Sequence, residues 1–218
     1  VVESIDSTQT FSVPSYSDFL EKRWALPYRT KVRKTFSGKA SGDPDAWDNA
    51  AVRDSGVARS STRELELDSK AGVLRVETPF SQGAAGAVAD REFSFPRFSF
   101  KVANPEASIF AVSADGKPLA QTKRFYLVAT GPSRMKGAKL TRSRTGVKEL
   151  GEMPVQCQVL EGVATLKGID ASKVRIRPLD ANGNKSAILP ISVTSDGGSF
   201  DLSKARSPVL EISLEGKE

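Results

Sequence analysis

Apolar and polar residues alternate along most of the chain, in short runs that are separated by turn-forming residues. The segment TRELELD alternates Leu65 and Leu67 with acidic residues. SKAG follows as a turn, and VLRVET then returns with Val73 or Leu74 and with Val76 pointing inward. Alternation with a period of two on both sides of a short turn is typical of an antiparallel hairpin. We therefore expect a β-hairpin in this segment.

The same pattern recurs in FSFPRFSFKVAN, in SIFAVSADGKPLAQTKRFYLVATG and in the last third of the chain, which closes with VLEISLEG. Pro96 interrupts the first of these segments, which predicts a bulge or an edge position. Turns are expected at three residue pairs, Asp115–Gly116, Asn182–Gly183 and Gly197–Gly198. In TPFSQGAAGAV, Gly83 and Gly86 predict a close approach between backbones. The segment lacks the GxxxxGK[ST] pattern of a phosphate-binding loop.

The beginning of the chain has a different pattern. In SYSDFLEKRWALPY, Ser15 is suited to cap a helix, Phe19 and Trp24 follow at near-helical spacing, and Pro27 ends the segment. We expect one short helix here. Residues 1–34 would then form a junction segment.

Many short strands and one short helix predict an all-β protein, an antiparallel β-sandwich of the jelly-roll or Ig-like kind. One large sandwich and two packed sandwiches are both compatible with the pattern. We divide the chain into the junction segment 1–34, a β-sandwich at 35–150, and a second small sandwich or the closing strands of the same unit at 151–218. Residues 131–154, rich in Gly, Ser, Lys and Arg, are either a linker or a long loop with some strand character.

The amino-acid composition excludes several kinds of catalytic and metal-binding site. The 218 residues include no histidine, which excludes Ser-His-Asp and Cys-His nucleophile systems and His-ligated metals. Cys157 is the single cysteine, and its alternation with glutamines in PVQCQVLEGV predicts a thiol on the buried face of a strand. No pair among the 26 Asp and Glu residues stands out as catalytic. No apolar run is long enough to span a membrane.

Basic residues are concentrated between residues 123 and 148, in a chain whose net charge is +6. A solvated loop, a site for an anionic polysaccharide and a nucleic-acid site are the alternatives for such a block. We expect no nucleic-acid binding, because neither a groove-reading helix nor stacking aromatic residues accompany the block. The candidate ligand-binding cations are Arg134, Lys136, Arg142 and Arg144.

The segment SGDPDAWDNAAVRDSG groups acidic residues around Trp47. Its carboxylates could hold a structural calcium ion, with Asp43, Asp45 and Asp48 as ligands, although the spacing is not that of an EF-hand. Trp47 could stack on a sugar ring. Turn-forming acids beside a tryptophan that covers the core are the alternative to both sites.

Four stretches of the chain resemble a known class of sequence. SSTRELELDSKAGVLRVETPFSQGAAGAV is similar to the C-terminal β-sandwich region of secreted bacterial glycoside hydrolases. The matching residues are Thr62, Glu64, Leu65, Asp68, Gly72, Val76, Thr78, Pro79 and Gln82. Further similarity lies in ASIFAVSADGKPLAQTKRFYLVATG, PVQCQVLEGVATL and VRIRPLDANGN.

The resemblance implies an accessory module and not an enzyme, because the catalytic carboxylates of such proteins lie on a separate (β/α) barrel. We expect it to bind a polysaccharide, either neutral or anionic, or to pack on that barrel. It also implies a secreted, periplasmic or cell-surface location. The alternatives are an Ig-like structural or adhesion module that binds no sugar, and an enzyme that uses an unrecognised carboxylate pair.

Overall fold

The computed structural model describes the following residues: 5–6, 34–35, 56–60, 62–142 and 146–214. The chain divides into two compact units, Val1–Glu77 and Thr78–Glu218, and each is described here by itself. The helix expected around Ser15 lies outside the described residues. Among the residues described, none belongs to a helix long and apolar enough to cross a membrane.

Unit 1 contains the hairpin expected from the first alternating segment. Strands β3 (Val57–Arg59), β4 (Leu65–Asp68) and β5 (Val73–Glu77) pair antiparallel in that order. Leu65 lies opposite Val76 and Leu67 opposite Leu74, so the four apolar side chains share one face. Strands β1 (Ile5–Asp6) and β2 (Lys34–Thr35) form a parallel pair. The predicted hairpin is confirmed.

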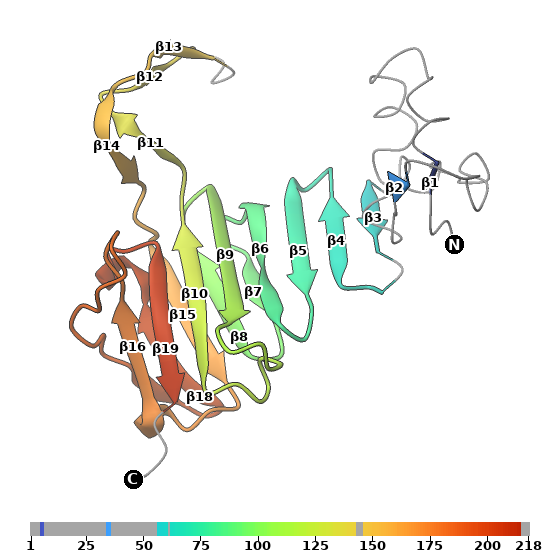
Figure 1. Cartoon of the computed structure of the whole chain (residues 1–218), viewed down its shortest axis with the longest axis vertical. Helices are drawn as coiled ribbons and strands as arrows, with labels where there is room; N and C mark the ends of the chain where they lie inside the picture. The colour runs from blue at the N-terminus through green and yellow to red at the C-terminus, as the bar shows by residue number, and fades with distance from the viewer. Residues whose placement is uncertain (1–4, 7–33, 36–55, 61, 143–145, 215–218) are drawn as a thin grey trace. The chain divides into compact units, whose positions relative to one another are not determined.

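Unit 2 contains two antiparallel sheets (Figure 1). The first sheet runs in the order β16 (Val174–Pro178), β19 (Val209–Leu214), β10 (Arg124–Thr130), β9 (Glu106–Ser113) and β6 (Ser81–Ala87). The second runs in the order β17 (Ser192–Thr194), β18 (Gly197–Asp201), β15 (Gly162–Lys167), β8 (Phe98–Val102) and β7 (Glu92–Ser94). The 3₁₀ turns η1 (Ala171–Lys173) and η2 (Leu202–Lys204) are short. The expected all-β sandwich architecture is confirmed.

The core of unit 2 lies between these two sheets. The second sheet contributes a cluster of stacked rings in which Phe98 and Phe100 have centroids 5.9 Å apart and Phe93 and Phe100 have centroids 5.1 Å apart. The first sheet contributes its inward residues, among them Ile109, Phe125, Leu127, Leu210 and Ile212. Because these residues occupy alternate positions of their strands, the residues between them face away from the core.

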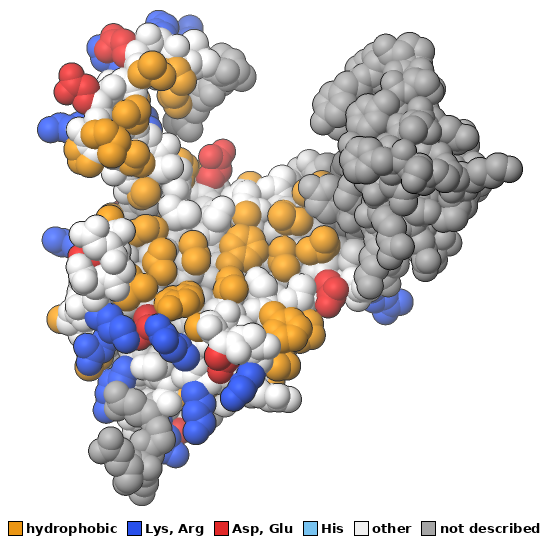
Figure 2. Space-filling view, viewed as in Figure 1, with side chains coloured by type: hydrophobic (Ala, Val, Ile, Leu, Met, Phe, Trp, Pro, Cys, Tyr) orange, Lys and Arg blue, Asp and Glu red, His pale blue; other side chains and the backbone are white. Residues whose placement is uncertain are grey.

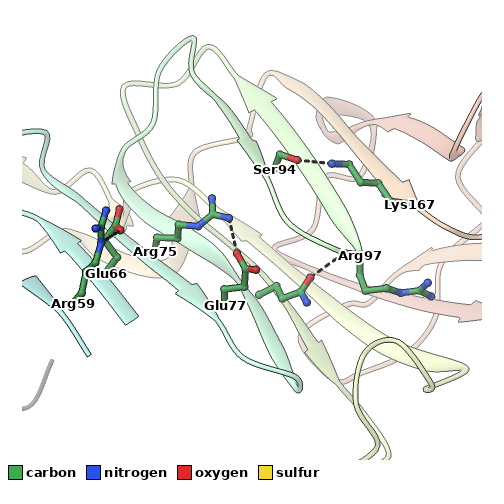
Figure 3. Close-up of polar contacts among 8 residues, drawn as sticks. Arg59, Glu66, Arg75, Glu77, Ser94, Arg97 and Lys167 are labelled. Carbon is green, nitrogen blue, oxygen red and sulfur yellow. Dashed lines mark hydrogen bonds and ion pairs between the residues drawn. The ribbon is translucent and has the colours of Figure 1, made fainter. Parts of the chain in front are cut away.

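A buried amide links the two sheets at one end. Gln82 on β6 is only 5% exposed, and its Oε1 accepts a hydrogen bond of 3.1 Å from the backbone N–H of Arg97, in the turn between β7 and β8 (Figure 3). A buried polar group needs such a partner, since an unpaired one costs about 1–3 kcal/mol. On the second sheet, Lys167 donates to Ser94 over 2.5 Å.

The structure corrects two local predictions. Pro96 is not at a bulge but follows β7, the edge strand of the second sheet, in a tight turn that is closed by the 2.8 Å hydrogen bond from Phe95 N to Phe98 O. Proline suits such a turn because its φ is already fixed near the required value. The turn expected at Gly197–Gly198 is formed by residues 195–196 instead, and both glycines lie in β18. A Cβ atom at Gly197 would collide with the carbonyl oxygen of Leu166, so glycine is required there for close approach.

Gly83 confirms the close approach that the small-residue segment predicts. A Cβ atom at this position of β6 would overlap the Ile109 carbonyl oxygen and the ring of Phe110 on β9. The Asn182–Gly183 turn is also present, and Gly183 has a φ of +82°. Strands from both sides of residue 150 lie in the same sheets, since β19 pairs with β10 and β15 pairs with β8.

Residues 133–142 and 146–157 form an antiparallel ribbon between β10 and β15. One ladder pairs β11 (Ser133–Lys136) with β14 (Glu152–Cys157), and the other pairs β12 (Lys139–Leu140) with β13 (Val147–Glu149). Figure 1 shows the ribbon projecting beyond the ends of the two sheets. We call the described residues of this ribbon, 133–142 and 146–157, the arm.

We predict that Phe100→Ala lowers the free energy of unfolding by about 3–5 kcal/mol, because it removes a ring that is 2% exposed from the centre of the stack. Phe80→Ala is the matched control, since that ring is 47% exposed and its loss should cost less than about 1 kcal/mol. Urea denaturation followed by circular dichroism measures both values. Equal losses would contradict the placement of the core.

Candidate functional site

The outward face of the first sheet brings basic and apolar side chains together. Cross-strand register places Arg177 of β16, Glu211 of β19, Tyr126 of β10 and Val112 of β9 in one row. A second row joins Arg175, Ser213 and Arg124 across the first three strands, and a third joins Val209, Val128, Phe110 and Gly83 across the last four. In Figure 2, Lys and Arg side chains gather toward one end of this face and hydrophobic side chains cover its middle. We call this surface the sheet face.

Glu211 is at the centre of the basic group. Its side chain is 4% exposed, although it lies on the outward side of β19. Arg124 binds Oε2 through both Nε (2.9 Å) and Nη2 (2.6 Å), and Lys185 binds Oε1 over 2.5 Å. Each carboxylate oxygen therefore has its own cation. Arg124 also donates to the hydroxyl of Tyr126 over 3.0 Å, which aligns the guanidinium with the ring.

The two cations determine the ionisation of the carboxylate. Burial by itself would raise the pKa of Glu211, but the hydrogen bonds from Lys185 and Arg124 outweigh it and hold this pKa below its usual value. The same contact raises the pKa of Arg124. Glu211 is therefore a carboxylate at neutral pH, and a general acid is not expected at this position.

A short turn positions Lys185. Asp180 accepts hydrogen bonds from the backbone N–H groups of Asn182 and Asn184, both at 2.8 Å, and from the Asn184 side chain at 2.9 Å. The hydrogen bonds from Asn184 and the backbone lower the pKa of Asp180. The bridge between Leu179 and Lys185 then closes the turn beside β19. The Asn182–Gly183 turn thus brings a cation from a loop onto the sheet face.

The basic group keeps an excess of positive charge. It contains four cations, Arg124, Arg175, Arg177 and Lys185, and one anion, Glu211, so its formal charge is 4 − 1 = +3. Arg175 donates to the carbonyl oxygens of Ser172 and Val174, each at 3.1 Å. Arg177 has no side-chain hydrogen bond or ion pair to any residue that the structure describes. Arg177 is therefore the cation best placed to meet an external anion.

The residues expected from the sequence lie elsewhere. Arg134, Lys136 and Arg142 are exposed on the arm, while Arg144, Trp47, Asp43, Asp45 and Asp48 lie outside the described residues. Within the described part of the chain, no three His, Cys, Asp or Glu side chains are grouped as metal ligands. Sequence reasoning missed Arg175, Arg177 and Glu211. Their signal was present in VRIRP and VLEISL, where charged residues alternate with buried ones.

Cys157 corrects a prediction about burial. It lies on a strand, as expected, but its side chain is exposed at the end of β14. Beside it is a hollow of about 60 Å³ at the root of the arm. Its lining includes Ala129, Val159, Leu160, Leu202 and Pro208. The alternation in PVQCQVLEGV correctly predicts a strand, but no second layer covers the thiol.

Comparison of the chain with models of protein families, with curated proteins and with solved structures found no match. The resemblance to accessory regions of glycoside hydrolases therefore remains a prediction from the sequence motifs. The geometry of the sheet face is the stronger guide to chemistry.

We predict that Glu211→Gln lowers the free energy of unfolding by about 1–3 kcal/mol at pH 7, because two cations lose a charged acceptor. A carboxyl whose pKa is lower in the folded than in the unfolded chain stabilises the fold above its unfolded pKa of about 4.3. That stabilisation is lost as the pH falls through the lowered folded value. The difference between the two proteins should accordingly shrink below pH 4.

Urea denaturation at a series of pH values measures this difference. Glu149→Gln is the control, because Glu149 and its partner Lys139 are 57% and 67% exposed and such a pair contributes about 0–1 kcal/mol. A loss for Glu211→Gln that is no larger than for Glu149→Gln would contradict the role of Glu211.

We also predict that Cys157 in the folded protein reacts with a water-soluble thiol reagent at a rate close to that in the urea-unfolded chain, because the side chain is exposed. Absorbance of the released chromophore follows the reaction. A reaction that requires unfolding would restore the original prediction of a buried thiol.

Proposed function

We propose that this protein is a non-catalytic β-sandwich module that binds an anionic polysaccharide on the sheet face, as an accessory part of an exported carbohydrate-active enzyme. The observation that carries the proposal is the cationic group around Glu211, which lies next to an apolar strip on an open sheet. The accessory role rests on the resemblance of the sequence motifs.

The cationic group fits an anion of polysaccharides, either a sulfate ester or a uronate carboxylate. Guanidinium groups bind both in a planar, two-pronged geometry that a lysine cannot reproduce. Arg177 is the available donor, and Arg124 is held in place by Glu211 and Tyr126. A ligand anion beside Arg177 would meet a surface whose net charge is already positive.

The apolar strip fits the sugar rings. Tyr126, Phe110, Val128 and Val209 are half-buried on the outward face, and the CH surface of a pyranose packs well on such groups. From β16 to β9 there are three strand intervals, which together span about 14 Å. A short stretch of polysaccharide across the strands would therefore contact both the cations and the apolar strip.

The cations of the arm and Trp47 remain predicted contributors. Arg134, Lys136 and Arg142 add positive charge on the same unit, which strengthens long-range attraction of a polyanion at low salt. Packing on a catalytic barrel is the other task that the sequence motifs imply for an accessory module.

We predict that Arg177→Gln weakens binding to a sulfated or uronate polysaccharide about ten-fold, which is the effect of losing one hydrogen bond to a charged group of about 1.5 kcal/mol. Calorimetric titration with heparin and with polygalacturonate measures it, with dextran as the neutral polymer. Affinity should also fall as salt is raised.

Lys101→Gln is the matched control, because Lys101 is exposed on β8 of the second sheet and does not belong to the sheet face. Equal losses in the two variants would mean that net charge alone is responsible. Binding to dextran alone would overturn the role of the cations, and binding to no polymer would favour a structural module without sugar recognition.

A further inference from the structure

The arm exposes both faces of a two-stranded ribbon. All six residues of β14 are exposed, as are those of β12 and β13. Two-stranded ribbons are marginal in water unless a further layer covers them. The arm therefore has the form of a ribbon whose covering layer would come from outside the two sheets.

Large apolar side chains occur along the whole arm. Leu150 and Met153 are 74% and 71% exposed. Met135 lies opposite Val155, and Leu140 lies opposite Val147, so apolar residues pair across both ladders. Exposed apolar surface of this extent on a small element marks an interaction site more often than a solvated loop.

The root of the arm is fixed to the sandwich. Asn104 is 5% exposed, its Nδ2 donates to the carbonyl of Val159 over 3.0 Å, and its Oδ1 accepts from the N–H of Glu161 over 2.7 Å. Gln158 N donates to Pro132 O over 3.0 Å, and Leu160 is 3% exposed. The arm therefore leaves the sandwich from a defined base.

The hollow beside Cys157 lies at this base. Its lining is mainly apolar, and its volume of about 60 Å³ suits the end of one apolar side chain. Interfaces commonly take much of their affinity from a single side chain anchored in such a pocket. Exposed apolar residues along the arm and a small apolar hollow at its base are together suited to contact with another protein.

The charge of the arm specifies the partner further. Its described residues include five cations, Arg134, Lys136, Lys139, Arg142 and Lys148, and two anions, Glu149 and Glu152, so the formal charge is 5 − 2 = +3. The chain as a whole carries +6. A second copy of this chain would bring like charge, whereas an acidic protein surface would be attracted.

We infer that the arm is a docking element for a protein with an acidic surface. This partner covers the exposed apolar residues of the arm and inserts an apolar side chain into the hollow at its root. Pro154 lacks a backbone N–H, so β14 is poorly suited to extending a sheet along its edge. The partner therefore packs on the side chains of the arm.

A photo-reactive amino acid at position 153 tests the inference in the host cell with the full-length protein. The same group at Val163, which is 46% exposed on β15 of the second sheet, is the control. We expect a cross-link to one acidic protein from position 153 and none from position 163. That protein is then purified for reconstitution.

Reconstitution decides whether the cross-linked protein is the occupant. Val155→Asp should weaken its binding at least ten-fold, whereas Val163→Asp should leave it unchanged, since the two valines are 51% and 46% exposed. Bound partner should also slow the reaction of Cys157 with a thiol reagent. Unchanged thermal unfolding midpoints show that both variants fold. Each variant adds one negative charge, so equal heparin binding by the two separates this surface from the sheet face.

Four results would overturn the inference. Cross-links between copies of this chain would make a second copy the occupant. Sedimentation of the wild-type protein, but not of Val155→Asp, with vesicles of phosphatidylglycerol would make the arm a lipid-binding element. Equal cross-linking from positions 153 and 163, or a purified partner that binds Val155→Asp as well as the wild type, would leave the arm without a docking role.

Discussion

The packing of the phenylalanine stack on the first sheet is the constraint on which the rest of unit 2 depends. It determines which side of each strand faces inward, and the opposite side is then available for recognition. On β10, for example, Phe125 and Leu127 enter the core while Arg124 and Tyr126 face outward. The basic group on the sheet face is therefore a direct consequence of how the same strands build the core.

The buried carboxylate explains how several cations can lie close together on one surface. Arg124 and Lys185 would repel one another if both were held over β19 without an anion between them. Glu211 supplies that anion. Arg124 and Lys185 offset its negative charge, so little negative potential remains at the surface around it. The surface can thus be ordered and still remain cationic, because Arg177 has no ion pair to any residue in the described part of the chain.

Local pattern was sufficient to predict the strands, since a period of two reports directly on one-sided burial. The hairpin at Leu65–Val76 and the Asn182–Gly183 turn follow from such local signals. The strands of the arm were expected only as a linker or a long loop with some strand character. Most of their residues are exposed on both faces, so no regular alternation of apolar and polar residues marks them. Cys157 illustrates a second limit of alternation as a signal. Alternation indicates on which face of a strand a residue lies, but it does not indicate whether another layer covers that face.

The sheet face was beyond local reasoning for a different reason. Arg124, Lys185 and Glu211 are far apart along the chain, and only the pairing of β10 with β19 and the turn after β16 bring them together. The strand order of a sheet depends on many long-range contacts at once. The sequence of each strand indicates that a charged residue lies on its outward side. It does not indicate which strands are neighbours, and so it could not predict that these charges form one cluster.

The two ends of the arm meet at the hydrogen bond between Gln158 and Pro132, so the ribbon enters and leaves the sandwich at a single point. A segment inserted in this way closes no large loop in the core and shares few of its contacts. Substitutions along the arm should therefore leave the stability of the sandwich almost unchanged. The body of unit 2 is the base that carries the arm, and the surface of the arm can be altered separately from the core.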